Sequence, residues 1–291
     1  MDRVHGDMPN ITISHVYDWI KYVEENNSKF KRNQHFHYRG ESRLDYKLLP
    51  TLYRKTNTPF EKEIYLSKNS EKKILIEFMT EAAGFVNNLS VDDKFRWVEY
   101  AQHFGVPTRL MDWTTNPLVA LYFSCSSNQN EDGRIYILNS LGYKLLSGEK
   151  NINGLENKLI KNEAERMIWD TEEAFPYPAV FKPYYFDRRM FAQSSQFMVW
   201  GFKKETLDKL VSELESEGRK KAVIRYLDIK GVEFELIEEV PILSEVRIDG
   251  KSKLQIQREL DNIGINHATL FPGLDGIGRS IEWRNNTNNV R

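Results

Sequence analysis

The spacing of apolar positions predicts alternating helices and strands along the chain. A period near 3.6 residues predicts helices over 11–27, 60–88, 90–104, 154–170, 204–217 and 252–263, with a further helix beginning at Pro117. Alternation of apolar and polar residues predicts strands at 35–40, 134–138, 196–202 and 222–229. The proline-containing segment 175–187 is expected to be an irregular loop. Because these elements follow no regular βαβ rhythm, the pattern favours an α+β fold with an antiparallel or mixed central sheet and a helical N-terminal cap.

Local signals mark several helix ends. Asn116 followed by Pro117 is typical of a helix start, since the amide side chain caps free N–H groups and proline suits the first turn. Ser90 with Asp93 resembles a capping box. Gly218 is expected to end the helix 204–217, because glycine enters the left-handed conformation without strain.

Composition excludes several classes of protein. Among the 291 residues, 41 Lys and Arg face 42 Asp and Glu, so a net charge of −1 gives no global field that would collect nucleic acid or an anionic membrane. The single cysteine, Cys125, cannot form an internal disulfide or a multi-thiolate zinc site and fits a reducing compartment. The longest apolar run, 118–123, is far too short to span a membrane, and no signal peptide is visible. We therefore expect a soluble, cytoplasmic protein with no membrane partner.

The first candidate for chemistry is the segment 35–40. On a strand, His35, His37 and Arg39 share one face. The two histidines could ligate a metal, but no further ligand is obvious by spacing, so no metal is expected. Arg39 can hold a phosphate or carboxylate in a bidentate manner, and an internal pair with a carboxylate is an equal alternative. Gly40 lacks a Cβ and so allows a ligand or a neighbouring backbone to approach closely.

The densest polar segment is 101–117, which is expected to contain a helix end, a loop and the next helix start. Its polar residues indicate either a binding site or a heavily hydrogen-bonded loop: Gln102, His103, Thr108, Arg109, Asp112, Thr114, Thr115 and Asn116. A helix N-terminus at Asn116 would suit an anionic ligand. A structural pair between Arg109 and Asp112, with Trp113 in the core, is the alternative. Ligand contact is favoured for His103, Thr114 and Thr115.

Several of these stretches together resemble a known family. YRGES at 38–42, AQHFGVPTRLMDWTTNPLVALYFSC at 101–125, DGRIYIL at 132–138, RMFAQSSQF at 189–197 and LFPGLDG at 270–276 are similar to the FRG domain, whose name refers to its (F/Y)RG motif. The resemblance runs over residues 12–283 and implies one domain. Within it we expect a mostly helical cap over 12–100 that contains the YRG strand, and an α+β core over 101–283. Residues 284–291 are expected to be a flexible tail. The family comprises bacterial, archaeal and phage-linked proteins of largely unassigned biochemical role.

A weaker resemblance suggests a mechanism. The order of elements is similar to the arginine-led branch of the ADP-ribosyltransferase superfamily, in which an Arg strand, a Ser/Thr strand with a following helix, and a catalytic Glu act on NAD. The matching positions are Arg39, residues 112–115 with Ala120 and Phe123, the strand 134–138, and Phe197. The position of the glutamate holds Arg188, which cannot stabilise an oxocarbenium-like charge. Asp112 is the first candidate to replace that acid, followed by three other carboxylates: Asp187, Glu41 and Glu99.

These resemblances imply roles for individual residues. Four are expected to be catalytic: Arg39, His103, Asp112 and Thr114. Nine are expected to bind ligand: Tyr38, Gly40, Gln102, Arg109, Thr115, Asn116, Arg188, Arg189 and Gln193. The expected function is an NAD-using transferase or glycohydrolase with a toxin or anti-phage role and a protein or nucleic-acid acceptor. One alternative is a non-catalytic module of a defence system that binds nucleotide or nucleic acid. The other is a metal-dependent hydrolase with His35, His37, His103 and Asp112. Catalysis and nucleotide recognition both require the stretches near 39, 112 and 189 to form one positively lined cleft.

Overall fold

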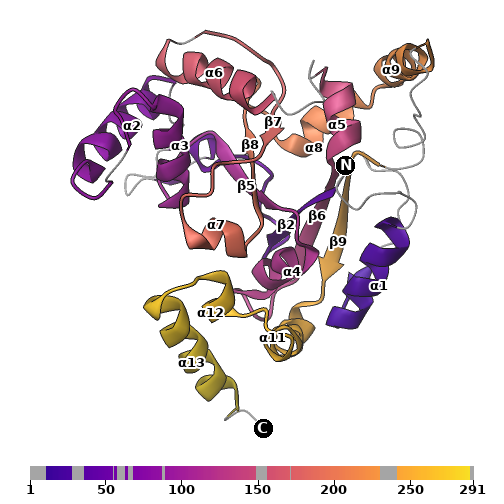
Figure 1. The fold of residues 1–291 in the computed structure, drawn as a ribbon. Coiled ribbons are helices and arrows are strands. Elements are labelled where there is room, and N and C mark those ends of the chain that lie inside the picture. Colours follow the sequence, from indigo (N-terminus) through magenta and orange to yellow (C-terminus); the bar gives the residue numbers. More distant parts are fainter. Residues whose placement is uncertain are drawn as a thin grey trace.

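A mixed seven-stranded sheet forms the centre of the molecule. The computed structural model describes residues 11–27, 36–54, 56–57, 63–64, 68–86, 89–148, 156–170, 172–229 and 241–288. The strands are ordered β1 (Thr12–Ile13), β9 (Leu243–Ile248), β6 (Gly133–Asn139), β2 (Phe36–Glu41), β5 (Leu110–Thr114), β8 (Ser195–Val199) and β7 (Ala179–Phe181) (Figure 1). Among the described strands of this sheet, only β1 and β9 pair in parallel. The mixed central sheet of an α+β fold is therefore confirmed. A short hairpin of β3 (Thr56–Asn57) and β4 (Glu63–Ile64) lies outside it.

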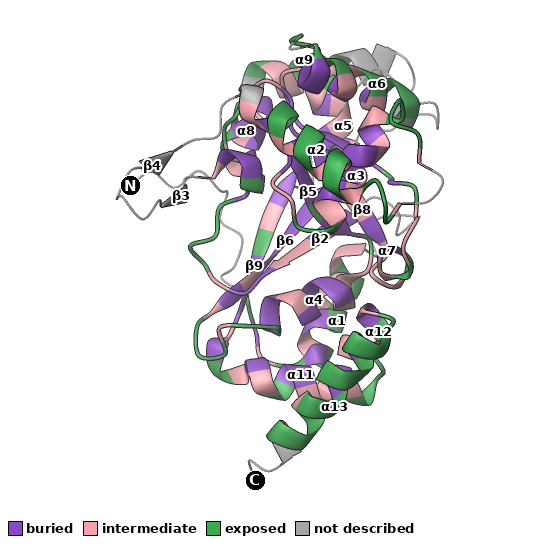
Figure 2. Ribbon diagram, turned by 90° about the vertical axis from the view of Figure 1, so that its left-hand side faces the viewer, coloured by how far each residue is buried: buried purple, intermediate pink, exposed green. Residues whose placement is uncertain are grey.

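Two groups of helices cover one face of the sheet (Figures 1 and 2). The first, α1 (Val16–Asn27), α4 (Pro117–Cys125) and α11 (Lys253–Asn262), packs on apolar residues of β9, β6 and β2. The second, α2 (Lys68–Ala82), α3 (Lys94–His103) and α6 (Glu156–Trp169), packs on β5, β8 and β7. Tyr38 lies directly opposite Thr114, and directly opposed residues point to the same side, so both groups share one face. The helices predicted within 12–100 are thus divided between the two groups.

The other face carries a third apolar core. Met111 and Trp113 of β5, with Tyr136 and Leu138 of β6, pack there against α5 (Ser140–Ser147) and α8 (Leu207–Leu214). Side chains alternate along a strand. Therefore β5 supplies Leu110 to the core on one face, and Met111 and Trp113 to the core on the other face.

The remaining helices lie at the periphery. The short α7 (Arg188–Ala192) contacts α12 (His267–Leu270). Largely exposed, α13 (Leu274–Asn288) reaches into the segment expected as a tail (Figure 2). Two short 3₁₀ turns are η2 (Thr51–Tyr53) and η3 (Gly250–Ser252).

Three segments differ from the sequence predictions. Residues 222–229 belong to a helix, α9 (Glu217–Ile229), so the strand predicted there is wrong. The loop expected before Pro117 contains β5, and the loop expected at 175–187 contains β7. Both strands are short and begin with consecutive apolar residues, and such strands lack the regular alternation by which a half-exposed strand is recognised.

Helix ends follow the predicted chemistry at some positions only. The Asn116 side chain caps α4 by accepting a hydrogen bond from the N–H of Leu118. Asp93 stands at the N-cap of α3 but its side chain makes no cap hydrogen bond, so the predicted capping box is not formed. Gly218 lies inside α9, after α8 has ended at Leu214. Among the described helices, none combines the length and the apolar character that a membrane span requires.

Candidate functional site

A cleft opens where β2 and β5 separate. The two strands pair at Tyr38 and Thr114, whereas β5 pairs with β8 along its whole length. Beyond that pair, β2 continues to Glu41 and the space between the two helical groups stays open. The cleft has a volume of about 400 Å³, within the range of roughly 300–1,000 Å³ typical of small-molecule sites. It brings together residues near 39, 112 and 189, with these side chains in its lining: Tyr38, Arg39, Glu41, Ser42, Gln102, His103, Asp112, Phe123, Arg189, Gln193, Ser195 and Phe271.

Arg39 crosses the gap between the separated strands. By alternation, Arg39 and Glu41 share a face of β2, and the guanidinium approaches Oε1 of Glu41 through Nε at 2.8 Å and Nη2 at 2.7 Å. Its Nη1 donates to the main-chain oxygen of Asp112 at 2.6 Å. The internal carboxylate pair is thus formed inside the cleft wall, and the guanidinium keeps a partly exposed edge. Arg39 therefore joins two strands that have no ladder hydrogen bonds at this point.

A short chain of hydrogen bonds orients Asp112. The Thr108 hydroxyl donates to Oε1 of Gln102 at 2.6 Å, and Nε2 of Gln102 donates to Oδ2 of Asp112 at 2.7 Å. The carboxylate lies on the floor of the cleft, open to solvent yet surrounded by protein atoms. That surrounding protein raises the pKa of Asp112, and the positive charge of Arg39 opposes the rise. Asp112 is therefore fixed in orientation through Oδ2 while its carboxylate lines the cleft.

His103 lies against a second arginine. Its Nε2 is 2.6 Å from Nη2 of Arg189 and 3.2 Å from Oδ2 of Asp187. Burial and the neighbouring Arg189 lower the pKa of His103, and Asp187 opposes this effect. The neutral ring accepts the hydrogen bond from Arg189 when Nε2 carries no proton. Asp187 also caps α7 by accepting from the main-chain N–H of Arg189 at 2.7 Å.

The start of α4 is satisfied internally. The Thr114 hydroxyl donates to the main-chain oxygen of Gln193 at 2.6 Å and accepts from the N–H of Asn116 at 3.0 Å. Asn116 caps the next turn, and Thr115 is exposed outside the cleft lining. The N–H groups expected to receive an anion therefore already have partners. Thr114 shapes the cleft wall, whereas Asn116, like Thr115, lies outside the lining. The Gln193 side chain ties that wall to Leu270 through a hydrogen bond of 3.0 Å.

Gly40 serves the approach of a backbone. A Cβ at this position would lie 1.9 Å from the main-chain oxygen of Ala120. Of the two explanations for this glycine, the structure shows the close approach of a helix, because α4 packs directly on β2.

Two arginines expected to contact ligand do not line the cleft. Arg109 is buried on the opposite side of β5 from the Asp112 side chain and donates from Nη2 to Oε2 of Glu71 at 2.6 Å. The pair expected between Arg109 and Asp112 is thus replaced by a pair with α2. Arg188 is exposed on α7. Of the reserve acids, Glu99 is buried and paired with Lys161 at 2.8 Å, away from the cleft lining.

The charges of the cleft balance. Arg39 and Arg189 face Glu41 and Asp112, so the positively lined cleft that the sequence suggested has no net positive charge from its ionised side chains. Sequence reasoning also missed Phe123 and Phe271 as wall residues, whose rings meet edge to face with centroids 6.2 Å apart. The helical apolar pattern gave no sign that Phe123 would face a cleft.

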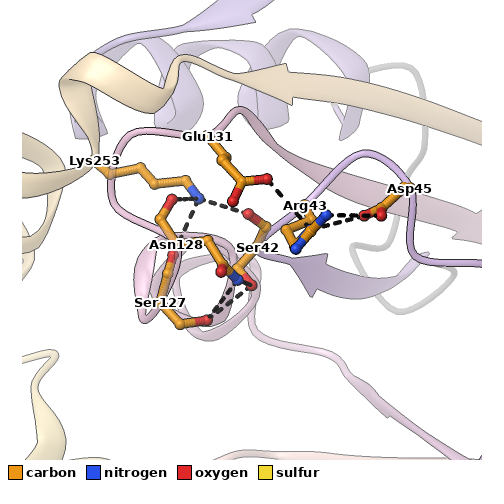
Figure 3. Close-up of polar contacts among 7 residues, drawn as sticks. All are labelled: Ser42, Arg43, Asp45, Ser127, Asn128, Glu131 and Lys253. Atoms are coloured by element: carbon orange, nitrogen blue, oxygen red, sulfur yellow. Dashed lines mark hydrogen bonds and ion pairs between the residues drawn. The ribbon is translucent and has the colours of Figure 1, made fainter.

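A buried lysine fixes the end of β2 beside the cleft (Figure 3). Lys253 of α11 donates to the main-chain oxygens of Ser42, Ser127 and Asn128 at 2.7, 3.2 and 3.0 Å. Burial lowers the pKa of Lys253. The Ser42 hydroxyl also receives hydrogen bonds from Ser127 and Asn128. Lys253 therefore connects the C-terminal part of the chain to the two loops that follow β2 and α4.

The comparison with protein-family models decides the family of this segment. Residues 34–133 match the model of the FRG domain. The chain contains an FRG domain. Its matched segment includes β2, α3, β5 and α4, and so supplies most of the cleft lining. Arg189, Gln193, Ser195 and Phe271 come from outside the matched FRG segment. Neither the curated proteins nor the solved structures gave a match.

The structure brings only some residues of the metal-site alternative together. His37 is buried and does not line the cleft, whereas His103 and Asp112 do. His35 lies outside the described residues. Among the residues described, no group of three or more His, Cys, Asp or Glu side chains could hold a metal ion.

Proposed function

We propose that the cleft of this FRG-domain protein binds NAD or a similar nucleotide and acts as a transferase or glycohydrolase. The observation that carries the proposal is the joint position of Arg39, Asp112 and Glu41 in one cleft with an aromatic wall. An ionised carboxylate on the floor of a small cleft can stabilise the positive charge that develops on a ribosyl group. Aromatic side chains offer surfaces for a nicotinamide or adenine ring.

The balance of charges favours a ligand that carries both signs. NAD has a cationic nicotinamide ring and an anionic pyrophosphate. Arg39 and Arg189 would face the phosphates, and Asp112 would face the ribose that bears the nicotinamide. In this reaction the bond between ribose C1′ and nicotinamide breaks, and the electron pair leaves with nicotinamide. Water or an acceptor then bonds to C1′ and releases a proton.

The test follows nicotinamide release from NAD by the purified chain. Asp112→Asn is expected to lower the rate by at least about 100-fold, because charge stabilisation of this kind contributes on the order of 10²–10³ in rate. Asp92→Asn, an exposed aspartate before α3, is the matched control. Arg39→Ala is expected to weaken NAD binding. No release by the unaltered chain, with or without added protein or nucleic acid, would contradict the proposal.

The pH profile gives an independent readout of the same carboxylate. The pKa of Asp112 is raised by its protein surroundings. Since the ionised form is the active one, the rate should fall on acidification at a higher pH than for an ordinary aspartate. Asp112→Glu should move this acid limb, whereas Asp92→Asn should leave it in place.

The biological role proposed with this activity is that of a toxin or anti-phage effector. Depletion of NAD, or ribosyl transfer to an essential molecule, would stop growth of the cell. Expression of the chain in bacterial cells is expected to arrest growth, and Asp112→Asn should relieve the arrest at equal protein level.

A non-catalytic nucleotide-binding module is the second candidate. It is favoured by the position where the resemblance places a catalytic glutamate, which holds Arg188 on the exposed side of α7. Thermal stabilisation by NAD without any nicotinamide release would support this second function over the first.

A further inference from the structure

Three large aromatic rings are exposed on α7, on the segment before it and at the end of α3. Phe191 of α7 is 75% exposed, Tyr184 is 64% exposed, and Phe104 at the end of α3 is 57% exposed. The ring of Tyr185 meets Phe191 edge to face with centroids 6.3 Å apart. Tyr184 is the chain neighbour of Tyr185, and the ring of Tyr184 faces the ammonium of Lys161 at 4.1 Å. Large rings left in water at neighbouring positions indicate a surface for a partner.

Cations accompany these rings. Arg188 and Phe191 stand three residues apart on α7, so they lie side by side on its exposed surface, while Met190 is buried behind them. Lys182 lies over the ring of Tyr185 at 5.3 Å. On the cleft side, the guanidinium of Arg189 lies 5.7 Å from the ring centre of Phe104.

Acidic charge is scarce within this segment. Between 182 and 191 the chain carries Lys182, Arg188 and Arg189 against the single carboxylate of Asp187. That carboxylate already caps α7 and contacts His103. The α7 surface, which we define as Phe104, Lys182, Tyr184, Arg188 and Phe191, therefore combines positive charge with exposed rings in a chain whose net charge is −1.

The α7 surface borders the cleft. Arg189 and His103 line the cleft, and each is a direct chain neighbour of a residue of this surface. Figure 1 shows α7 between the helical group of α3 and the group of α4 and α12. A molecule bound on α7 would therefore reach the mouth of the cleft.

We infer that the α7 surface binds single-stranded nucleic acid, which is the acceptor of the ribosyl group; this acceptor role rests on the function proposed above. Unpaired bases stack on exposed rings, while arginine and lysine hold the phosphates, and neither contact needs a particular sequence. In a duplex the bases are stacked on one another and cannot use the rings. In the transfer, a base nitrogen or a phosphate oxygen bonds to C1′ as nicotinamide leaves, and any proton on the nucleophile passes to Asp112 or water.

Binding is measured on the full chain by fluorescence anisotropy with a labelled 12-nucleotide single strand. The measurement is made once with a DNA strand and once with an RNA strand, which shows which of the two the protein binds. The annealed duplex of each strand is measured for comparison. Phe191→Ala is expected to weaken binding about 5- to 100-fold, the range for loss of one stacked base. Arg188→Ala should reduce the slope of log K against log salt by about 0.7. Tyr17→Ala on α1 and Lys251→Ala in η3 are matched exposed controls.

Transfer is followed on the same variants as label from NAD that becomes attached to the strand. The ratio of transfer to nicotinamide release should fall in Phe191→Ala and stay at the unaltered value in Tyr17→Ala. Equal affinity of the unaltered chain and Phe191→Ala for the nucleic-acid strand would overturn the proposal that the α7 surface binds it. Absence of binding to DNA and RNA strands at low salt would overturn it as well. Strand binding by the unaltered chain with no nicotinamide release overturns the proposed reaction and, with it, the acceptor role.

Discussion

Two of the arginines singled out in the sequence, Arg109 and Arg39, pair with carboxylates in different surroundings. Arg109 and Glu71 are both buried, so their pair belongs to the core. Arg39 and Glu41 form a pair at the wall of the cleft, where water still reaches the guanidinium. The sequence could single out both arginines as candidates, but it could not assign their partners. Glu71 lies 38 positions from Arg109, and only the packing of α2 on β5 brings them together.

The buried pair gives the first stability prediction. Glu71→Gln leaves the charge of Arg109 without a counter-charge in the core, so the free energy of unfolding should fall by about 3–5 kcal/mol. Urea unfolding measures the change. Glu77→Gln, an exposed position on the same helix, should stay within about 0.5 kcal/mol of the unaltered chain. A loss of less than 1 kcal/mol for Glu71→Gln would show that Arg109 finds another partner.

A buried histidine predicts the pH dependence of stability. Burial, with a smaller effect of Lys144, lowers the pKa of His37 to about 3. Between this value and the unfolded value near 6.5, the unfolded chain binds a proton that the folded chain does not. Stability is therefore lost as the pH falls below about 6.5, with a slope of at most about 1.4 kcal/mol per pH unit from this group.

The measurement compares urea unfolding of His37→Gln and the unaltered chain between pH 7 and pH 5. The variant should lose less stability on acidification. His15→Gln is the opposite control, because a hydrogen bond to Glu259 raises the pKa of His15. That raised pKa stabilises the fold at low pH, so its removal should steepen the acid loss. Parallel pH curves for His37→Gln and the unaltered chain would contradict the prediction.

At the scale of elements, the sequence predicted best those with a clear period or cap. The α4 start follows from Asn116 and Pro117, and β6 follows from alternation. Residues 222–229 are rich in strand-forming residues, but the same stretch also places Val223 and Leu227 one helical turn apart. The structure packs Val223 against the core beneath α5 and α8. Packing of Val223 against this core therefore outweighed strand propensity here.

The contact of α4 with β2 can be tested at Gly40. Alanine would place its Cβ 1.9 Å from the main-chain oxygen of Ala120, so α4 must move away from the sheet. The expected loss is at least about 1–3 kcal/mol, the usual cost of overpacking. NAD turnover should fall as well, because α4 forms one wall of the cleft. Gly218→Ala, where no atom lies within 4 Å of the new Cβ, should be neutral or slightly stabilising in thermal unfolding.

At the scale of the whole molecule, the cleft depends on segments that are far apart in the sequence. The motifs around 39, 112 and 189 indicated one site, and the structure places residues from all three in one lining. Its charge could not be predicted, because the sequence showed the arginines and gave no sign that Glu41 would turn back onto Arg39. Nor did the sequence show that Phe271, near the C-terminus, would complete the aromatic wall.

The last prediction concerns the segment 34–133 on its own. Within it, β5 would keep a single register pair with β2, since its main partner β8 lies outside the segment. Only Gly133, the first residue of β6, lies within the segment, so β2 would lose the partner to which it pairs along six positions. Lys253, which holds the loops after β2 and α4, would also be absent. An isolated sheet of this kind leaves apolar faces and strand edges in water.

The fragment 34–133 should therefore show no cooperative thermal unfolding and little dispersion of amide proton signals. The fragment 11–288, which keeps β8, β9 and α11, should unfold cooperatively and serves as the control. Lys253→Met in the full chain tests the hydrogen bonds that Lys253 makes to the loops after β2 and α4. The three carbonyls would lose their donor, and the free energy of unfolding should fall by about 1–3 kcal/mol. A folded fragment 34–133 would mean that the FRG segment is stable without the strands that flank it, and the cleft would then be assembled by later docking of the C-terminal half.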